Sequence, residues 1–205
     1  EEPSFVQQLF AHNIHVVINC ASLSSPWGSK ELFLKANITT QKNLLYECQK
    51  VSVQRFIYIS SPSIYFDFKD ALNINEETPL PKRMVNQYAQ TKHQAEKLLI
   101  KSSLPYVILR PRALIGRGDT VIMPRLIRSY QEGKLRIIGN GKNRVDLTSV
   151  SNMTEAVNLA IFTSNYNETY NISNGEPVNL WHSINHVLQA IDLPPVEKKM
   201  PYSIL

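Results

Sequence analysis

The sequence contains little cysteine and lacks any long apolar run. Its 205 residues include only two cysteines, Cys20 and Cys48, too few for a disulfide framework and without metal-ligand spacing. We expect both to be reduced, buried thiols. No apolar run approaches the roughly 20 residues that span a bilayer, and no basic segment followed by an apolar core opens the chain. These absences predict a cytoplasmic protein with no transmembrane segment.

Blocks of like charge are also missing. The net charge is +5, but the basic residues are spread along the chain, so binding to nucleic acid is not expected. Hydrophobic residues make up 43% and charged residues 19%, which is ordinary for a globular protein and argues against disorder. A chain of this length can form one large domain, or one domain with a small appendage.

What is present is an alternation of strand and helix patterns. Runs rich in β-branched and other apolar residues at 14–21, 55–59 and 106–109 are typical of buried strands in a parallel sheet. Helical spacing predicts helices at about 30–50 and 86–101 between them. This order predicts an α/β fold with a doubly wound, Rossmann-like parallel sheet.

Both ends of this pattern look incomplete. A short helix within residues 1–13 feeds directly into the first buried strand, which predicts that earlier strands of the sheet are absent at the N-terminus. Residues 1–111 are assigned to the sheet domain. Residues 112–205 are predicted to be mostly a small lobe over the strand ends, where ligands bind in open α/β sheets, and to be truncated at the C-terminus. The elements predicted there are helices at 120–132, 152–163 and 178–191, strands at 135–138 and 145–150, and a strand near 169–172 that joins the sheet.

The strongest chemical pattern joins a strand end to a helix. The strand at 55–59 is followed by Ser60 and Ser61, and Asn86 can cap a helix that carries Tyr88 and Lys92. Residues four apart share a helix face. A phenol is a weak base at neutral pH, and a nearby ammonium group favours its ionised form. The three side chains could move a proton to or from an alcohol.

Other readings of the polar residues are weaker. A tyrosine and a lysine four apart are common by chance on a solvated helix face. A functional role becomes the favoured interpretation only because a strand that ends in serines lies upstream. His182 and His186 are also four apart, but no glutamate lies between them in a metalloprotease pattern, so no metal site is predicted. The segment 116–119 is glycine-rich but lacks the lysine and the spacing of a phosphate-binding loop.

Taken together, these residues resemble the extended short-chain dehydrogenase/reductase superfamily over nearly the whole chain. The resemblance implies that Tyr88 is the general acid/base, that Lys92 holds the nicotinamide ribose, and that Ser61 orients the substrate oxygen. It also implies that residues 1–111 are the C-terminal part of a dinucleotide-binding domain and that residues 112–205 are mostly a substrate-binding lobe. The implied cofactor is NAD or NADP.

Further site residues follow from the same resemblance. The strand end at 16–21 looks like the family's fourth strand, and residues 37–43 match its N-V-x-G-T-x-N motif only in part. Residues 110–114 resemble the segment that passes the nicotinamide. The cofactor-binding residues implied are Cys20, Ala21, Ser22, Asn37, Ser60, Tyr88, Lys92, Pro111 and Ala113, and the substrate-binding residues are Ser63, Arg112 and Arg144.

One departure from the family pattern concerns the cofactor. No glycine occurs before Gly28, so the family's Gly-rich phosphate loop and the segment that selects NAD or NADP are not among these residues. We therefore expect this 205-residue chain by itself to bind dinucleotide poorly and to be inactive. The helices around 30–50 and 86–101 could form a homodimer interface.

The branch of the superfamily is indicated by later segments. Residues 60–66, 139–150 and 172–181 look most like the 3β-hydroxysteroid dehydrogenases, the sterol 4α-carboxylate 3-dehydrogenases and the 2-alkyl-3-oxoalkanoate reductases, which implies a small apolar substrate. A nucleotide-sugar epimerase or dehydratase stays an alternative, although Val145 stands where those enzymes tend to carry an arginine, with Arg144 one residue early. A non-catalytic dinucleotide-binding sensor or scaffold is the alternative from another class.

Overall fold

A computed structural model describes residues 3–25, 27–201 and 203. The chain divides into two compact units, and each is described by itself. The first comprises Glu1–Pro111 and Glu155–Ile172, and the second comprises Arg112–Thr154 and Ser173–Leu205. The first unit thus includes most of the helix predicted at 152–163, in addition to the strand near 169–172.

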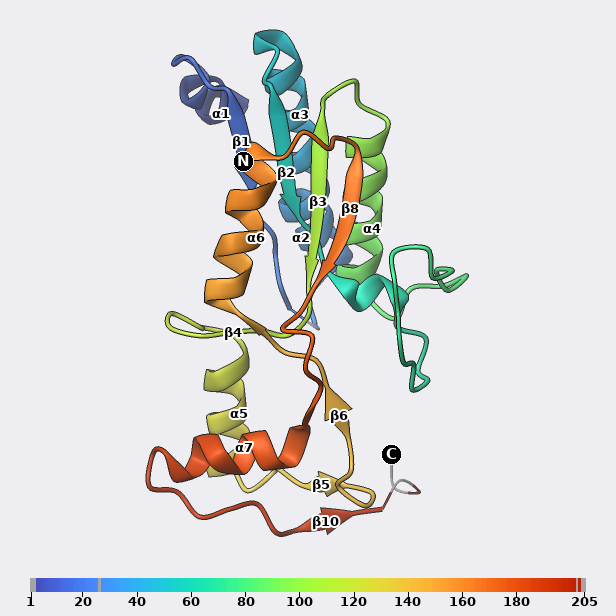
Figure 1. The fold of residues 1–205 in the computed structure, drawn as a ribbon, viewed down its shortest axis with the longest axis vertical. Helices are drawn as coiled ribbons and strands as arrows, with labels where there is room; N and C mark the ends of the chain where they lie inside the picture. The colour runs from blue at the N-terminus through green and yellow to red at the C-terminus, as the bar shows by residue number, and fades with distance from the viewer. Residues whose placement is uncertain (1–2, 26, 202, 204–205) are drawn as a thin grey trace. The chain divides into compact units, whose positions relative to one another are not determined.

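A four-stranded parallel sheet forms the centre of the first unit. Its strands are β1 (Val16–Asn19), β2 (Arg55–Ile59), β3 (Tyr106–Pro111) and β8 (Glu168–Ile172), in the spatial order β1-β2-β3-β8 (Figure 1). Every neighbouring pair is parallel, so all carboxyl ends meet at one edge of the sheet. The predicted α/β class with a parallel, Rossmann-like sheet is confirmed.

Helices cover both faces of this sheet. In Figure 1, α2 (Lys30–Phe33), α3 (Thr40–Val51) and α4 (Gln87–Ile100) lie behind it, and α6 (Val150–Phe162) runs in front. A short α1 (Pro3–Leu9) precedes β1, as predicted. The helix predicted at 30–50 is present, but a π-helical segment at Leu34–Thr39 separates α2 from α3. The homodimer through these helices stays a prediction.

The core of the first unit lies between the sheet and the helices behind it. Phe56 and Tyr58 of β2 and Ile108 of β3 pack against Leu99 of α4 and Cys48 of α3, and each is almost fully buried. Strands buried on both faces need apolar residues in succession rather than in alternation, which explains the continuous apolar runs of β2 and β3. The predicted burial of the first strand holds less well, because Ile18 of β1 is 41% exposed.

The two cysteines differ in exposure. Cys48 is buried as expected, and this burial raises the pKa of its thiol to about 12. Cys20 is exposed, so the expectation of burial is wrong for that residue. Cys20 comes directly after Asn19, the last residue of β1.

The described part of the second unit contains two complete helices, the start of α6, and strands of two residues each. The helices are α5 (Ile122–Gln131) and α7 (Leu180–Gln189), and Trp181, Ile184 and Leu188 of α7 pack with Val196 in a small core. The strands pair as β4 (Leu114–Ile115) with β7 (Thr148–Ser149), β6 (Arg144–Val145) with β9 (Val178–Asn179), and β5 (Ile137–Ile138) with β10 (Lys199–Met200).

The single strand predicted at 145–150 is wrong. Residues Arg144–Val145 pair antiparallel with β9, whereas Thr148–Ser149 pair parallel with β4, and Val150 already begins α6. The two short strands have different partners, and Asp146 and Leu147 between them belong to neither strand. One strand of six residues and two strands of two residues each give the same apolar alternation in the sequence, so the pattern cannot distinguish them.

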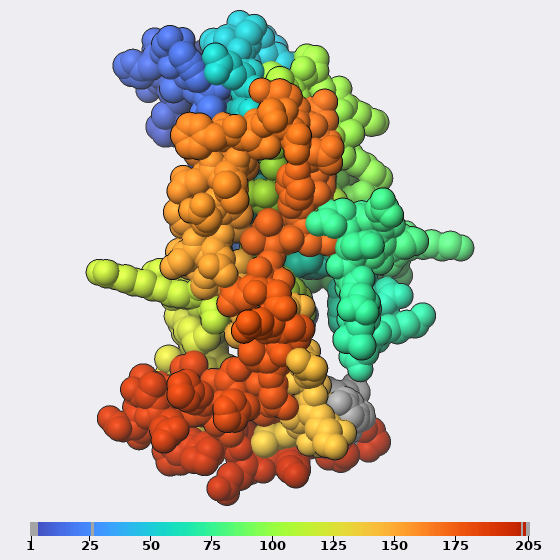
Figure 2. Space-filling model, viewed as in Figure 1, coloured from blue at the N-terminus to red at the C-terminus, as the bar shows by residue number. Residues whose placement is uncertain are grey.

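A long excursion of the first unit leaves the sheet after β2. It begins with a 3₁₀-helix, η2 (Pro62–Tyr65), and continues without helix or strand to Asn86. Figure 2 shows it projecting from the surface of the first unit. Within residues 3–25, 27–201 and 203, no helix is both long and apolar enough to cross a membrane.

Candidate active site

Residues 60–63, which we call the serine turn, begin where β2 ends. Ser60 continues the ladder, because its backbone N–H donates to the Leu109 carbonyl (2.7 Å). Its hydroxyl oxygen is buried and has no hydrogen-bond partner among the residues that the structure describes. Ser61 is in an extended conformation and caps η2, since its Oγ accepts from the Ser63 backbone N–H (3.2 Å) and donates to Ser63 Oγ (3.0 Å). Strand and cap together fix the backbone that carries all three hydroxyls.

Helix α4 holds the predicted tyrosine and lysine. Its N-terminus is capped as predicted, with the Asn86 side chain accepting from the Ala89 backbone N–H (2.8 Å). Tyr88 is half-buried, and Lys92, one turn further on, is only 2% exposed. The Lys92 Nζ lies 6.0 Å from the centre of the Tyr88 ring.

Lys92 connects the helix to the serine turn. Its Nζ donates to the carbonyl oxygen of Ile59 (2.7 Å), the residue just before Ser60, and lies 4.8 Å from the centre of the Tyr58 ring. Burial lowers the pKa of Lys92 to about 8, although the charges of Glu96 and Cys20 act in the opposite direction. A buried ammonium group with a carbonyl as its hydrogen-bond partner is poised to stabilise negative charge nearby.

The segment after β1 is held by two buried amides. Asn37 exchanges hydrogen bonds with the Leu23 backbone (2.7 Å and 3.5 Å) and also donates to the Thr91 hydroxyl on α4 (2.9 Å). Asn19 accepts from the Ala21 backbone N–H (3.0 Å). Asn37 therefore acts within the protein as a tie between this loop and α4, and its role toward a cofactor stays a prediction. Of the other predicted residues here, Cys20 and Ala21 are exposed and Ser22 is half-buried.

A second polar group lies one turn further along α4. The Glu96 carboxylate is 2% exposed and forms two hydrogen bonds with the Arg110 guanidinium on β3 (2.8 Å and 2.7 Å). Arg110 also donates to the Tyr65 hydroxyl in η2. Burial would lower the pKa of Arg110, but hydrogen bonding and attraction to Glu96 raise it above its ordinary value. Glu96 and Arg110 thus hold Tyr65, at the end of η2. The sequence analysis did not predict these contacts.

One signal in the sequence could have found this pair. Glu96 follows Lys92 by four residues, so it lies on the same buried face of α4. A carboxylate on a buried helix face needs a cation opposite it. The arginine in the apolar run of β3 is the natural partner, because the sheet covers that face of the helix.

The remaining predicted residues lie at or beyond the end of β3. Pro111 is the last residue of β3, and Ala113 in the second unit has a left-handed backbone (φ 43°), which is uncommon for a residue with a Cβ. The backbone carbonyl of Arg112 accepts from the Thr148 hydroxyl (2.6 Å). Arg144 is exposed on β6, where its guanidinium donates to the Pro177 carbonyl (2.8 Å). The structure brings Ser60, Ser61, Ser63, Tyr88 and Lys92 together through the contact of Lys92 with Ile59, while Arg112, Ala113 and Arg144 belong to the other unit.

The first unit has features that fit the nicotinamide end of a dinucleotide. The Ser60 hydroxyl is buried with no partner in the described part of the chain, and the Lys92 ammonium group has three N–H donors beside the same strand end. Ligands of parallel α/β sheets bind at the carboxyl ends of the strands, which is where both groups lie. Within the described residues, no group of three or more His, Cys, Asp or Glu side chains could hold a metal ion.

Comparisons with known proteins agree with this arrangement. The sequence is 30% identical over 202 residues to the 2-alkyl-3-oxoalkanoate reductase of Shewanella oneidensis, covering 91% of this chain and 52% of that protein. It is also 30% identical over 200 residues to the human sterol-4-alpha-carboxylate 3-dehydrogenase, decarboxylating, covering 92% of this chain and 54% of that protein. The chain thus spans about half the length of these curated relatives. Both fall within the branch that the sequence motifs predicted.

A solved structure and a family model extend the comparison. MoeE5 in complex with UDP-glucuronic acid and NAD is 25% identical, with a TM-score of 0.76 and coverage of 95% of this chain and 68% of that one. The model of the NAD dependent epimerase/dehydratase family matches residues 1–173. The predicted resemblance to this superfamily and the NAD-type cofactor of the family are confirmed. By this match, the chain belongs to the NAD dependent epimerase/dehydratase family.

Proposed function

We propose that the protein is an NAD(P)-dependent oxidoreductase that interconverts a secondary alcohol and a ketone on an apolar substrate of the sterol or 2-alkyl-3-oxoalkanoate type. The observation that carries this proposal is the position of Lys92. Its buried ammonium group is hydrogen-bonded at the base of the serine turn and lies one helix turn from Tyr88. The names of the two relatives with about 30% identity support the substrate class.

The roles of the side chains follow from their chemistry. In the oxidative direction, the Tyr88 phenolate accepts the proton of the substrate hydroxyl, and in the reductive direction the phenol returns it. The positive charge of Lys92 stabilises the phenolate form. The Ser61 hydroxyl, which can rotate away from Ser63, donates a hydrogen bond to the substrate oxygen. A bound nicotinamide would supply or accept the hydride, and Lys92 and Ser60 are the residues in this chain that would contact its ribose end.

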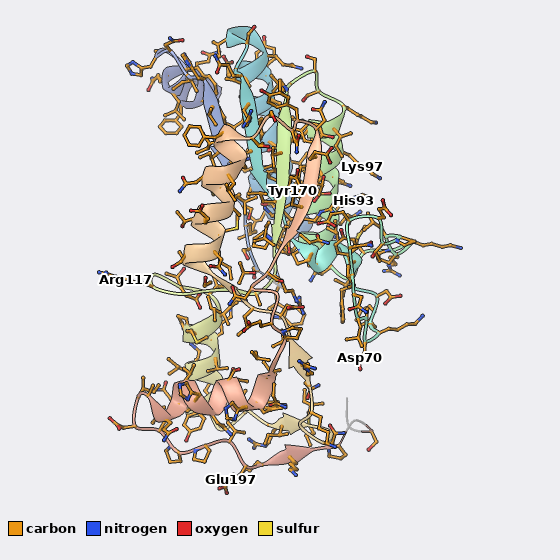
Figure 3. All side chains as sticks on the ribbon, viewed as in Figure 1. Asp70, His93, Lys97, Arg117, Tyr170 and Glu197 are labelled. Atoms are coloured by element: carbon orange, nitrogen blue, oxygen red, sulfur yellow. The ribbon has the colours of Figure 1, made fainter. Side chains whose placement is uncertain are left out.

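The role of Tyr88 is tested by a variant that keeps the ring and removes the hydroxyl. In full-length protein, Tyr88→Phe should lower kcat by about 10²- to 10⁴-fold, because the proton acceptor is lost, while the dissociation constant for NAD(P) stays within twofold or so. Turnover is followed by nicotinamide absorbance with sterols and 3-oxo acids of different chain length. Tyr170→Phe is the matched control, since Tyr170 lies exposed on β8 (Figure 3) and should behave as wild type. Retained turnover in Tyr88→Phe would rule out its assigned role.

The same assay separates the alternatives. A nucleotide-sugar epimerase would convert a UDP-sugar without a net change in nicotinamide absorbance. Arg144 and Val145 support the oxidoreductase over that alternative, because Arg144 is exposed on β6 and the successive residue Val145 faces the opposite side of the strand. A dinucleotide sensor would bind NAD(P) with every substrate left unchanged.

A further inference from the structure

The segment between Tyr65 and Glu76 leaves the sheet and returns to a single residue, Asn171 on the edge strand β8. At the start, the Tyr65 hydroxyl donates to Asn171 Oδ1 (3.3 Å). At the end, the Glu76 carboxylate accepts from the Asn171 backbone N–H (2.5 Å). Residues 66–75, which we call the clasped loop, therefore have both ends fixed at one point of the sheet.

The position of Asn171 is fixed by the neighbouring strand and by its contact with Glu76. Asn171 pairs in register with Arg110 in the neighbouring strand β3, and the Arg110 guanidinium is anchored by the buried Glu96 carboxylate. Among the described strands, β8 lies at the edge of the sheet, so one side of its backbone at Asn171 has no neighbouring strand to bond. Glu76 accepts a hydrogen bond from that edge, which gives the end of the loop a defined position.

The clasped loop exposes an unusual amount of apolar surface. Phe66, Phe68, Leu72 and Ile74 are 46%, 77%, 87% and 38% exposed, and the rings of Phe66 and Phe68 lie 5.4 Å apart. Figure 3 shows Asp70 at the far end of the loop, away from the sheet, and Figure 2 shows the loop standing out from the surface. Several exposed apolar side chains within ten residues indicate a contact surface for a ligand or a partner.

The surroundings of the loop favour a small apolar ligand as the occupant. The loop begins immediately after the turn that carries Ser61 and Ser63, so the proposed substrate site and the loop belong to one continuous segment of the chain. The charged residues of the loop are Asp67, Lys69 and Asp70, one cation and two anions, and Lys69 lies 3.9 Å from Asp67. This balance offers no attraction to an anionic lipid surface, which basic clusters recognise.

We propose that the clasped loop binds the apolar part of the substrate, with Phe68 and Leu72 as contact residues and Asn171 and Glu76 as positioning residues that hold the loop in place. The inference rests on the proposed function for the identity of the substrate. It adds the element that selects an apolar molecule, a task that the hydroxyls and charges around Lys92 cannot perform.

The contact residues are tested with dansyl-undecanoic acid, a fluorescent probe with an apolar chain. Binding of the probe to full-length protein is measured for a Phe68→Ser, Leu72→Ser double variant. We expect its Kd to rise about tenfold, because apolar contact area is lost from the complex. A Leu159→Ser, Phe162→Ser double variant is the matched control, because both residues are exposed on α6 at 63% and 84%, and its Kd should equal that of wild type. An unchanged Kd in the loop variant would overturn the proposal.

The clasp is tested by two substitutions at one position. Glu76→Gln keeps an oxygen that can accept from the Asn171 N–H and should leave probe binding close to wild type. Glu76→Ala releases the end of the loop, so amide hydrogen exchange in residues 66–75 should accelerate by about tenfold and the Kd for the probe should rise with it. Faster exchange with an unchanged Kd would contradict the positioning role of Glu76.

These measurements separate the inference from the proposed function, because probe binding requires no turnover. Loop-dependent binding in a protein that oxidises no alcohol would leave the inference intact and remove the oxidoreductase assignment. A wild-type protein that binds neutral phosphatidylcholine vesicles through the loop, but not the free probe, would overturn the inference in favour of a lipid surface.

Discussion

The two compact units differ most in where they place polar groups. Among the described residues, the buried polar and charged side chains lie in the first unit, with Thr148 as the exception in the second. Those of the first unit include a lysine, a glutamate and an arginine close to the serine turn. The second unit is instead stabilised by helix caps and short strand pairs around one small apolar core.

This difference reflects what each unit has to hold. Buried charges are costly unless they are paired, and in the first unit they fix the strand ends where chemistry is proposed. The second unit has no comparable group among its described residues, and its polar contacts lie nearer to solvent, where each contributes less. We therefore expect substitutions of polar residues to be far more damaging in the first unit than in the second.

The largest effect should come from the buried ion pair. Glu96→Ala leaves the Arg110 guanidinium without its partner and should lower the free energy of unfolding by about 3–5 kcal/mol. Glu132→Ala in the second unit removes an ion pair with the same N–O distance, 2.7 Å, but one that is exposed, and should be indistinguishable from wild type. Urea unfolding followed by far-ultraviolet circular dichroism checks both. Equal effects of the two substitutions would break the comparison.

Lys92 should make the stability of the first unit depend on alkaline pH. Burial lowers its pKa from 10.5 to about 8 in the folded protein, so between these values the unfolded chain binds one proton more than the folded chain. Stability should therefore rise with pH across this window, by about 1.4 kcal/mol per pH unit at most. The measurement is the difference between wild type and Lys92→Met in urea unfolding at pH 7 to 10. The exposed Lys97→Met on the same helix should follow wild type, and a flat difference for Lys92 would contradict its burial as a charged group.

A smaller effect is expected at a helix cap of the second unit. Asp119 accepts from the backbone N–H groups of Val121, Ile122 and Met123 (2.8, 2.9 and 2.8 Å). Burial acts to raise the pKa of Asp119, but these three hydrogen bonds outweigh it and lower the pKa below 3.8. Its contribution is therefore present above that value and is lost as the pH falls further.

The contribution of the Asp119 cap to stability can be followed through the fluorescence of Trp181, a buried residue of the second unit. Asp119→Ala should lower the free energy of unfolding by about 1 kcal/mol at neutral pH, and Asp119→Asn, which retains an acceptor oxygen, by less. Trp181 fluorescence in urea reports this change. A loss as large as that of Glu96→Ala would show that the two units do not differ in the way described.

Local signals predicted the elements of the first unit well. The apolar runs of β2 and β3 and the Asn86 cap of α4 can be read directly, because each depends on neighbours in the sequence. The spacing of Tyr88 and Lys92 likewise follows from one helix turn. The position of the serine turn against Lys92 depends on the parallel sheet, which the alternation of elements also predicts.

Contacts between distant residues could not be predicted in the same way. The guanidinium of Arg55 at the start of β2 donates to the Ala160, Ile161 and Thr163 carbonyls at the end of α6, more than 100 residues away (2.6 Å each). Nothing in the sequence around an arginine that precedes an apolar run predicts which distant carbonyls it will contact. The same holds for Asn171, whose side chain and backbone bind two residues that come about 100 positions earlier.

The π-helical segment Leu34–Thr39 has a consequence for how this chain tolerates changes in length. Each residue added to or removed from a helix rotates everything beyond it by about 100°. Asn37 lies in this segment and contacts Leu23 and Thr91, while Leu45 and Cys48 of α3, beyond it, lie in the core. Deleting one residue here would restore regular winding, but it would turn either the amide or the apolar face of α3 away from its partners. We therefore expect a change of length in this segment, where Asn37 and Ile38 are buried, to disrupt these contacts.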